Sequence, residues 1–326
     1  MANDAFDAAL ADAGLDLGGL AAMAGTDAES MAGLLADHVE PDPARRARTA
    51  RALVNIGVRL GERNHLQVAV ALYRLVADRY GQDPGSALRR QAARALVNMG
   101  IDLADLGRRE DAIAAYQEVA DRYGADPGPA LRKLTAQALI NMGVDLGDLG
   151  RREDAVAAFR QVAGRYSEDP DPELRERVAR ALVVMGLDLT DLGRFEDAIA
   201  ACRQVAEHYG EDADPALRER TAQAFLTMGT CLAALDRPED AIAAYQQVAD
   251  RYREDPAAAL RKARARALGM TGVLLHALGR AEEADAAFRQ VVDCYGDDDP
   301  ALREQVRKAS RALRSKSRWR WRLRWP

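Results

Sequence analysis

The chain has 326 residues, of which 48% are hydrophobic and only 5% aromatic, and its formal charge at pH 7 is −5. A modest net charge gives no whole-chain reason to expect nucleic acid binding, and three cysteines without a CxxC pair support neither a disulfide framework nor a zinc knuckle. The acidic start lacks the basic and apolar regions of a signal peptide, and no apolar run is long enough to span a membrane. The sequence therefore predicts a cytoplasmic protein, and its richness in Ala, Arg, Gly and Asp favours a bacterial source.

Residues 1–44 are predicted to form an acidic N-terminal segment. The first 40 residues carry eight acidic side chains and neither Lys nor Arg. Short amphipathic stretches broken by Gly predict a helical cap for the part that follows, and an adaptor segment that contacts a partner is the alternative.

A sequence unit of 43 residues is copied six times between residues 45 and 307. Its marker is a glycine that ends triplets such as NMG or TMG. Every interval between successive marker glycines is 43 residues, and these are Gly57, Gly100, Gly143, Gly186, Gly229 and Gly272. Such a constant register indicates internal duplication, and repeats of this length predict an elongated array in which neighbouring copies stack.

Each repeat is predicted to hold two helices. The first helix begins at an Asp-Pro pair, because Asp caps a helix N-terminus and Pro fits the first turn. Three such pairs are Asp171-Pro172, Asp214-Pro215 and Asp299-Pro300. This helix ends at a glycine suited to a C-terminal cap, as at Gly107, Gly150 and Gly193. The second helix begins at an EDA motif, whose carboxylates suit the positive end of the helix dipole.

The apolar and small residues of the repeat follow a known pattern. In the second repeat its members are Leu96, Met99-Gly100, Leu103, Gly107, Ala112 and Tyr116. The pattern resembles the tetratricopeptide repeat (TPR), although the copies here are longer than the usual length of about 34 residues. In length they are similar to the repeats of kinesin light chains and of many bacterial arrays.

The TPR resemblance implies a fold and a working surface. The fold is an all-α, right-handed TPR-like solenoid of six helix-turn-helix repeats, with an N-terminal helical cap and a C-terminal helix. The first helices are expected to line the concave face, where Asn residues of related proteins commonly hold peptide main chain.

A polar stripe runs along the predicted first helices. In the second repeat Arg94, Asn98, Asp102 and Asp105 fall within about 80° of one another on a helical wheel, opposite the apolar side. Stacking would bring equivalent residues of successive repeats into register, and the stripe fades after the fourth repeat. The candidate peptide-binding residues are Arg51, Asn55, Arg94, Asn98, Asp102, Asp105, Gln137, Asn141, Asp145, Asp148, Arg180 and Asp188.

Two interpretations of this stripe stay open. An Asn side chain offers a donor and an acceptor, so a row of them suits a peptide main chain, and the Asp residues favour a partner segment with Lys or Arg. Alternatively, duplication has copied the Asn residues, or they bond to neighbouring helices, while the Asp residues form a solvated face. We predict a non-catalytic protein–protein interaction scaffold that binds a peptide segment on its concave face. The alternative is a self-associating structural module that uses the solenoid ends and the oppositely charged termini.

No pattern of catalytic or cofactor-binding residues accompanies the repeats. The four histidines are scattered without metal-ligand spacing, and neither GxxxxGK[ST] nor GxGxxG follows a strand pattern. Cys202 takes the place of Tyr116 in its repeat and is predicted to fill the core. We therefore predict no enzymatic activity, cofactor or metal.

Residues 308–326 are predicted to be the end of a C-terminal helix and a basic tail. Residues 305–326 carry nine basic side chains and no acidic one. The tail residues of interest are Arg318, Trp319, Arg320, Trp321, Arg322, Arg324 and Trp325. This composition suits anionic lipid, single-stranded nucleic acid, or the acidic stripe of the chain itself. A disordered end or an artefactual extension is the alternative.

Overall fold

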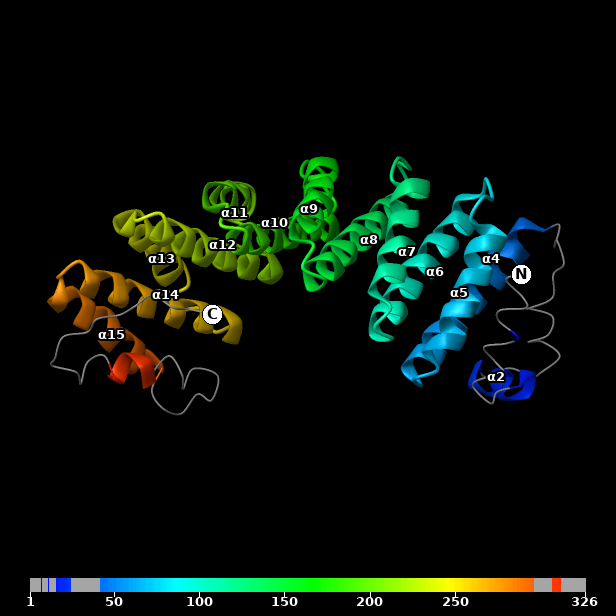
Figure 1. Cartoon of the computed structure of the whole chain (residues 1–326), viewed down its shortest axis with the longest axis horizontal. Coiled ribbons are helices and arrows are strands. Elements are labelled where there is room, and N and C mark those ends of the chain that lie inside the picture. Colours follow the sequence, from blue (N-terminus) through cyan, green and yellow to red (C-terminus); the bar gives the residue numbers. More distant parts are fainter. Residues whose placement is uncertain (1–6, 8–10, 12–15, 25–41, 296–306, 312–326) are drawn as a thin grey trace. The chain divides into compact units, whose positions relative to one another are not determined.

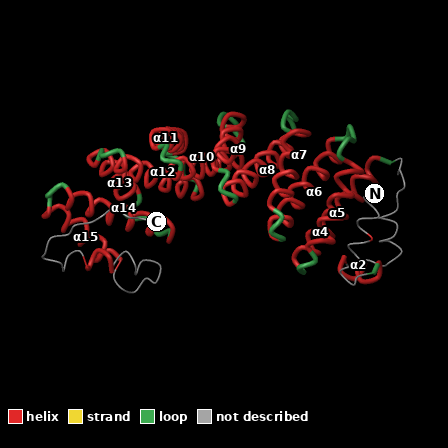
Figure 2. The backbone as a smooth tube through the Cα atoms, viewed as in Figure 1, coloured by secondary structure: helices red, strands yellow, loops and turns green. Residues whose placement is uncertain are grey.

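A computed structural model of the chain describes residues 7, 11, 16–24, 42–295 and 307–311, apart from a few side chains at the ends of these ranges. Within these residues every regular element is a helix and none is a strand (Figure 2). The predicted cap at Asp299-Pro300 and the whole Arg/Trp tail lie outside the described residues. None of the described helices is both long and apolar enough to cross a membrane.

The six repeats fold as six helix pairs. The first helices are α4 (Pro43–Glu62), α6 (Ser86–Asp105), α8 (Pro129–Asp148), α10 (Pro172–Asp191), α12 (Pro215–Ala234) and α14 (Ala258–Ala277). The second helices are α5 (Leu66–Tyr80), α7 (Arg109–Tyr123), α9 (Arg152–Tyr166), α11 (Phe195–Tyr209), α13 (Pro238–Arg251) and α15 (Ala281–Tyr295). The predicted two helices are present in every repeat, and the first is the longer of the two.

The chain divides into two compact units, residues 1–177 and 178–326. In the N-terminal unit the helices from α4 to α9 pack in chain order, and the first helices α4, α6 and α8 also contact their neighbours of the same kind (Figure 1). In the C-terminal unit the helices from α11 to α15 pack in the same manner. The predicted all-α, TPR-like solenoid is therefore confirmed.

A further helix, α2 (Leu17–Ala24), packs against α4 ahead of the repeats. It buries Leu20 and Ala21, which are 0% and 2% exposed. The helical cap predicted for residues 1–44 stays a prediction, because most of this segment lies outside the described residues.

The helix ends follow the predicted signals at α10 and α12. By contrast, α6, α8 and α14 begin after Gly85, Gly128 and Ala257, which make no side-chain cap hydrogen bond. Asp214 caps α12 by accepting hydrogen bonds from the backbone N–H groups of Ala216 (2.8 Å) and Leu217 (3.3 Å). Asp171 accepts in the same way from the N–H of Glu173 at 3.0 Å. The predicted C-terminal glycines have left-handed backbones, with φ of 76° at Gly107, 77° at Gly150 and 72° at Gly193. These are the backbone angles that glycine adopts without steric cost.

Ion pairs connect successive repeats of the N-terminal unit. Arg46 at the start of α4 lies 2.6 Å from Asp83 in the loop before α6. The pair recurs one repeat later between Arg89 and Asp126 at 3.0 Å, and again between Arg132 and Asp169. Each aspartate is well buried, so these pairs fix the loop against the preceding first helix.

The marker glycines let the two helices of a repeat approach closely. A Cβ atom at Gly100 would lie 2.4 Å from Cε1 of Tyr116, whose ring is buried against α6. The equivalent contact in the first repeat joins Gly57 to Tyr73, also at 2.4 Å. In the fourth repeat the Sγ atom of Cys202 takes the place of the ring, which confirms the predicted core role of this cysteine.

Candidate functional site

The structure divides the predicted polar stripe into exposed and buried residues. Among the twelve candidates, the exposed ones are Arg51, Asn55, Asp105 and Asp148. The half-buried ones are Arg94, Asn98, Gln137, Asn141, Arg180 and Asp188. Asp102 and Asp145 are buried, with 9% and 6% of their surface exposed. The interpretation in which the aspartates form a solvated face is therefore wrong for Asp102 and Asp145.

Asp102 is buried because it faces the preceding repeat. It lies at the edge of the stripe, where its carboxylate comes within 3.2 Å of the position that a Cβ atom would take at Gly61 of α4. Its Oδ2 atom is buried without a hydrogen-bond partner. Burial raises the pKa of Asp102 to about 6, and the nearby charge of Asp105 adds to the rise.

Asp145, the equivalent residue of the third repeat, has a cationic neighbour. Its Oδ1 atom lies 3.6 Å from Nε of Arg109, which also reaches Asp148 at 2.9 Å. Burial raises the pKa of Asp145, while the charge of Arg109 acts in the opposite direction. The residue one repeat before Arg109 is Leu66. Asp102 therefore lacks the guanidinium that accompanies Asp145.

The mid-helix asparagines bond to tyrosines of the preceding repeat. Burial raises the pKa of the Tyr73 hydroxyl, and a hydrogen bond with the Asn98 side chain acts to lower it. Tyr116 and Asn141 are related in the same way one repeat later. The Asn141 side chain also accepts a hydrogen bond from Gln137 at 2.7 Å. These asparagines therefore connect successive repeats, whatever else they bind.

The sequence of the remaining repeats follows this pairing. The third repeat has Phe159 at the tyrosine position, which removes the hydroxyl, and the next repeat has Val184 at the Asn position. In the fifth repeat the Tyr245 hydroxyl lies 3.2 Å from Oγ1 of Thr230 in its own repeat, and Met270 follows at the Asn position. Asn is therefore replaced where the preceding repeat has no tyrosine hydroxyl, or has one that contacts a threonine of its own repeat.

This pairing predicts a measurable coupling between Tyr116 and Asn141. Tyr116→Phe is expected to lower the free energy of unfolding by about 1 kcal/mol, because Asn141 loses a hydrogen-bond partner. In an Asn141→Ala background the same change is expected to be nearly neutral. Urea denaturation of the four proteins of this double-mutant cycle measures the coupling. Additive effects of the two substitutions would contradict the hydrogen bond.

The stripe borders a surface hollow of about 480 Å³ in the N-terminal unit. Helices α4, α6 and α8 supply its lining, which consists of Arg51, Arg90, Gln91, Arg94, Ala130, Lys133 and Leu134. Arg51 and Arg94 are in the predicted site, and the other five residues are not. Arg90 could have been found from the sequence, because it lies one helical turn before Arg94 on the same face.

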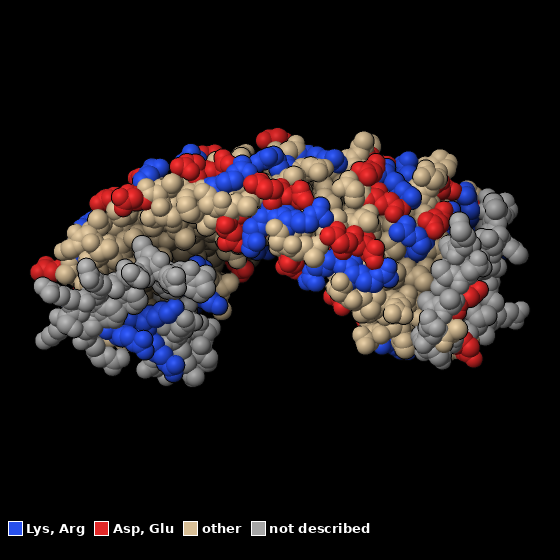
Figure 3. Space-filling view, in the orientation of Figure 1, with Lys and Arg blue, Asp and Glu red and all other residues tan. Residues whose placement is uncertain are grey.

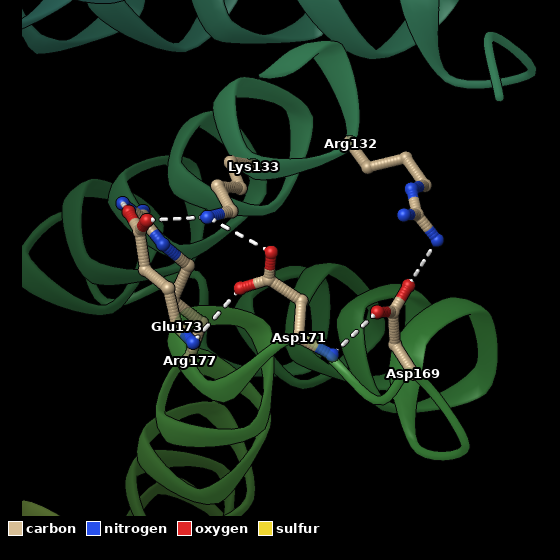
Figure 4. Close-up of polar contacts among 6 residues, drawn as sticks. All are labelled: Arg132, Lys133, Asp169, Asp171, Glu173 and Arg177. Carbon is tan, nitrogen blue, oxygen red and sulfur yellow. Dashed lines mark hydrogen bonds and ion pairs between the residues drawn. The ribbon is translucent and has the colours of Figure 1, made fainter. Parts of the chain in front are cut away.

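The charges around the hollow are unevenly paired. The ammonium group of Lys133 lies 2.9 Å from carboxylate oxygens of both Asp171 and Glu173 (Figure 4). By contrast, Arg51, Arg90 and Arg94 form no ion pair with any residue that the structure describes. Elsewhere on the visible face of this unit, acidic and basic side chains lie interspersed (Figure 3). The hollow therefore has an excess of positive charge.

Apolar side chains also reach solvent on the first helices. Ile101 on α6 and the equivalent Val144 on α8 are 40% and 38% exposed. Ile101 lies seven residues after Arg94, and Val144 lies seven residues after Gln137. Each therefore lies on the face of its helix that carries the polar stripe. Neither residue is among the predicted site residues, all of which are polar. Among the described residues, no three His, Cys, Asp or Glu side chains gather in a way that could hold a metal ion.

Two family models, both described as Tetratricopeptide repeat, match the chain. One matches residues 91–168 and 177–254, and the other matches residues 226–299. Together they cover more than half of the sequence and all but the first repeat. The chain is a tetratricopeptide repeat protein. The predicted family is confirmed, whereas the likeness to kinesin light chains stays a prediction.

Solved structures match this TPR protein at low sequence identity. An engineered protein is 18% identical, with a TM-score of 0.54, and the match covers 96% of this chain and 71% of that chain. BtubC (BKLC) from P. vanneervenii is 14% identical, with a TM-score of 0.51, and the match covers 87% and 98%. PilF from Pseudomonas aeruginosa is 15% identical, with a TM-score of 0.47 and coverage of 79% and 97%. None of the curated proteins compared with the chain matches it.

Proposed function

We propose that this TPR protein is a non-catalytic scaffold that binds a peptide segment of a partner protein on the face formed by the first helices α4, α6 and α8. The observation that carries the proposal is the hollow, which all three helices line. Its lining includes three arginines that form no ion pair with a described residue. Its lining combines charged side chains with Ala130 and Leu134, so the hollow offers contacts to both polar and apolar groups of a peptide.

The exposed apolar residues support the same face. Ile101 and Val144 occupy equivalent positions in neighbouring repeats, so a segment that crosses α6 and α8 would meet both. Apolar side chains at regular spacing provide binding energy through burial, at about 25 cal/mol per Å². The unpaired arginines of the hollow provide orientation and selectivity.

Several sequence-based alternatives stay predictions. Self-association through the solenoid ends and the oppositely charged termini depends in part on residues outside the described ranges, and binding of lipid or nucleic acid through the Arg/Trp tail depends on them entirely. The proposed partner segment with Lys or Arg rested on the aspartates of the stripe. Because Asp102 and Asp145 are buried and Asp148 is paired with Arg109, the basis for a basic segment is weakened.

The proposal is tested by removing the exposed apolar groups from this face. Peptides are selected on the full-length protein from a displayed random library, and their affinities are measured by fluorescence anisotropy. The double substitution Ile101→Ser and Val144→Ser is expected to weaken the selected peptides by about 10-fold or more.

The chain offers a matched control for this test. Leu149 and Leu278 are 40% and 37% exposed, almost the same as Ile101 and Val144, but they lie at the ends of α8 and α14. Leu149→Ser with Leu278→Ser is expected to leave peptide affinity unchanged. The proposal would be contradicted if peptides bound the Ile101→Ser, Val144→Ser protein normally but lost affinity for the Leu149→Ser, Leu278→Ser protein.

A further inference from the structure

The arginines at the hollow differ from their neighbours in having no carboxylate partner. Arg89, next to Arg90 in sequence, is paired with Asp126 at 3.0 Å, and Arg132, next to Lys133, is paired with Asp169. Lys133 itself has two carboxylate partners. Arg51, Arg90 and Arg94 are left without one among the described residues, and all three line the same hollow. Three like charges gathered in this way repel one another unless an anion is bound.

A second, independent observation at the hollow is an unpaired acceptor. Gln91, between the arginines on α6, is only 4% exposed, and its Oε1 atom is buried without a hydrogen-bond partner. A buried acceptor without a donor costs about 1–3 kcal/mol. A rotation of the Gln91 side chain that turns Oε1 into the hollow would let a ligand N–H group recover part of this energy. A simple anion supplies no such donor, whereas a peptide main chain does.

The rest of the lining distinguishes between classes of macromolecule. Ala130 and Leu134 of α8 are the remaining lining residues, and the lining contains no aromatic side chain. Proteins that bind single-stranded nucleic acid combine positive charge with aromatic side chains on which the bases stack. The hollow has the charge without the aromatic residues, which favours a polypeptide.

We propose that the hollow binds an acidic segment of a partner protein. Its Asp or Glu carboxylates pair with Arg51, Arg90 and Arg94, and its main chain donates an N–H group to the Oε1 atom of Gln91. The inference rests on the proposed scaffold function and gives its partner a chemistry. It replaces the basic segment expected from the sequence, because the charges available to a ligand at this hollow are positive.

The test compares short fluorescein-labelled peptides in anisotropy titrations with the full-length protein. The acidic probe repeats Glu-Gly-Asp-Ser, the basic probe repeats Lys-Gly-Arg-Ser, and the neutral probe repeats Gln-Gly-Asn-Ser. Arg90→Gln with Arg94→Gln is expected to weaken the acidic probe by about 10-fold or more, since hydrogen bonds to charged groups contribute strongly. Gln91→Leu is expected to weaken it by about threefold.

A matched control removes the same charge elsewhere. Arg160 on α9 and Arg203 on α11 are exposed on second helices, and Arg160→Gln with Arg203→Gln is expected to change the affinity of the acidic probe by less than about twofold. Circular dichroism melts of all variants establish that each one folds. Equal losses in the two double variants would mean unspecific charge attraction and would overturn the inference.

Two further outcomes separate this inference from the scaffold proposal. If the acidic probe does not bind, while library-selected peptides still depend on Ile101 and Val144, the acidic partner is wrong and the scaffold stands. If neither kind of peptide binds, both fall. A single-stranded RNA oligonucleotide that binds more tightly than the acidic probe, with the same dependence on Arg90 and Arg94, would also overturn the inference.

Discussion

Gly100→Ala is expected to lower the free energy of unfolding by about 1–3 kcal/mol, which is the usual effect of an overpacked core. The added methyl group would lie 2.4 Å from the buried ring of Tyr116, so either the ring or helix α7 must move away from α6. Because each repeat contacts its neighbours, the displacement would also disturb the hydrogen bond between Tyr116 and Asn141. Urea denaturation followed by circular dichroism measures the change.

A glycine on a second helix provides the matched control. Gly164 lies near the end of α9 and is exposed, and a Cβ atom there would have no neighbour within 4 Å. Gly164→Ala is therefore expected to raise the free energy of unfolding by about 0.5–1 kcal/mol, because alanine favours the helix. If both substitutions changed stability in the same direction, the close approach of α6 and α7 would be contradicted.

The fourth repeat allows a second test of the same contact. A Cβ atom at Gly186 would lie 2.7 Å from Sγ of Cys202 and would meet this one atom in place of a ring. Cys202→Ala removes the sulfur. Gly186→Ala is then expected to be less destabilising in the Cys202→Ala background than in the wild-type protein.

The fold could be predicted from the sequence because its signals are local and repeated. The Asp-Pro pair at Asp214 and the glycine at Gly107 act on their own helix ends, through capping and through a left-handed backbone. The marker glycine and the residue at the position of Tyr116 determine how closely the two helices of a repeat pack. The marker glycine recurs in all six repeats and the left-handed C-terminal glycine in four of them, so the same local structure is specified repeatedly along the chain.

The candidate site depends on contacts between repeats, which a helical wheel does not contain. The wheel placed Asp102 in the polar stripe, but the absence of a side chain at Gly61 lets α4 cover it. The wheel also placed Asn98 there correctly, without revealing that Tyr73 of the preceding repeat is its partner. The hollow joins side chains of three helices, so the role of Gln91 could be recognised only from the structure.

The buried carboxylate of Asp102 is expected to make the array less stable at alkaline than at mildly acidic pH. Burial raises its pKa from the ordinary 3.8 to about 6, so between these values the folded protein binds more protons than the unfolded chain. The free energy of unfolding therefore falls as pH rises through this range, and the stabilisation from the protonated carboxyl group is fully present only below about pH 4.

Asp102→Asn removes this charge and is expected to raise the free energy of unfolding at pH 8 by about 1–3 kcal/mol. The gain over the wild-type protein should shrink towards zero as the pH is lowered to about 4, where Asp102 is protonated. Asp145→Asn is the matched control, because Asp145 has Arg109 as a neighbour at 3.6 Å. Its gain at pH 8 should be smaller, since the substitution also removes an attraction.

The missing guanidinium can be supplied at Leu66, which occupies in the first repeat the position of Arg109 in the second. Leu66→Arg is expected to bring a positive charge to Asp102, to lower its pKa, and to raise the free energy of unfolding at pH 8. In an Asp102→Asn background the same substitution should give no gain, because no charge remains for it to pair with. Urea denaturation of the four proteins at pH 8 and pH 5 measures this coupling. A gain from Leu66→Arg that is independent of residue 102 would show that the uncompensated carboxylate is not the cause.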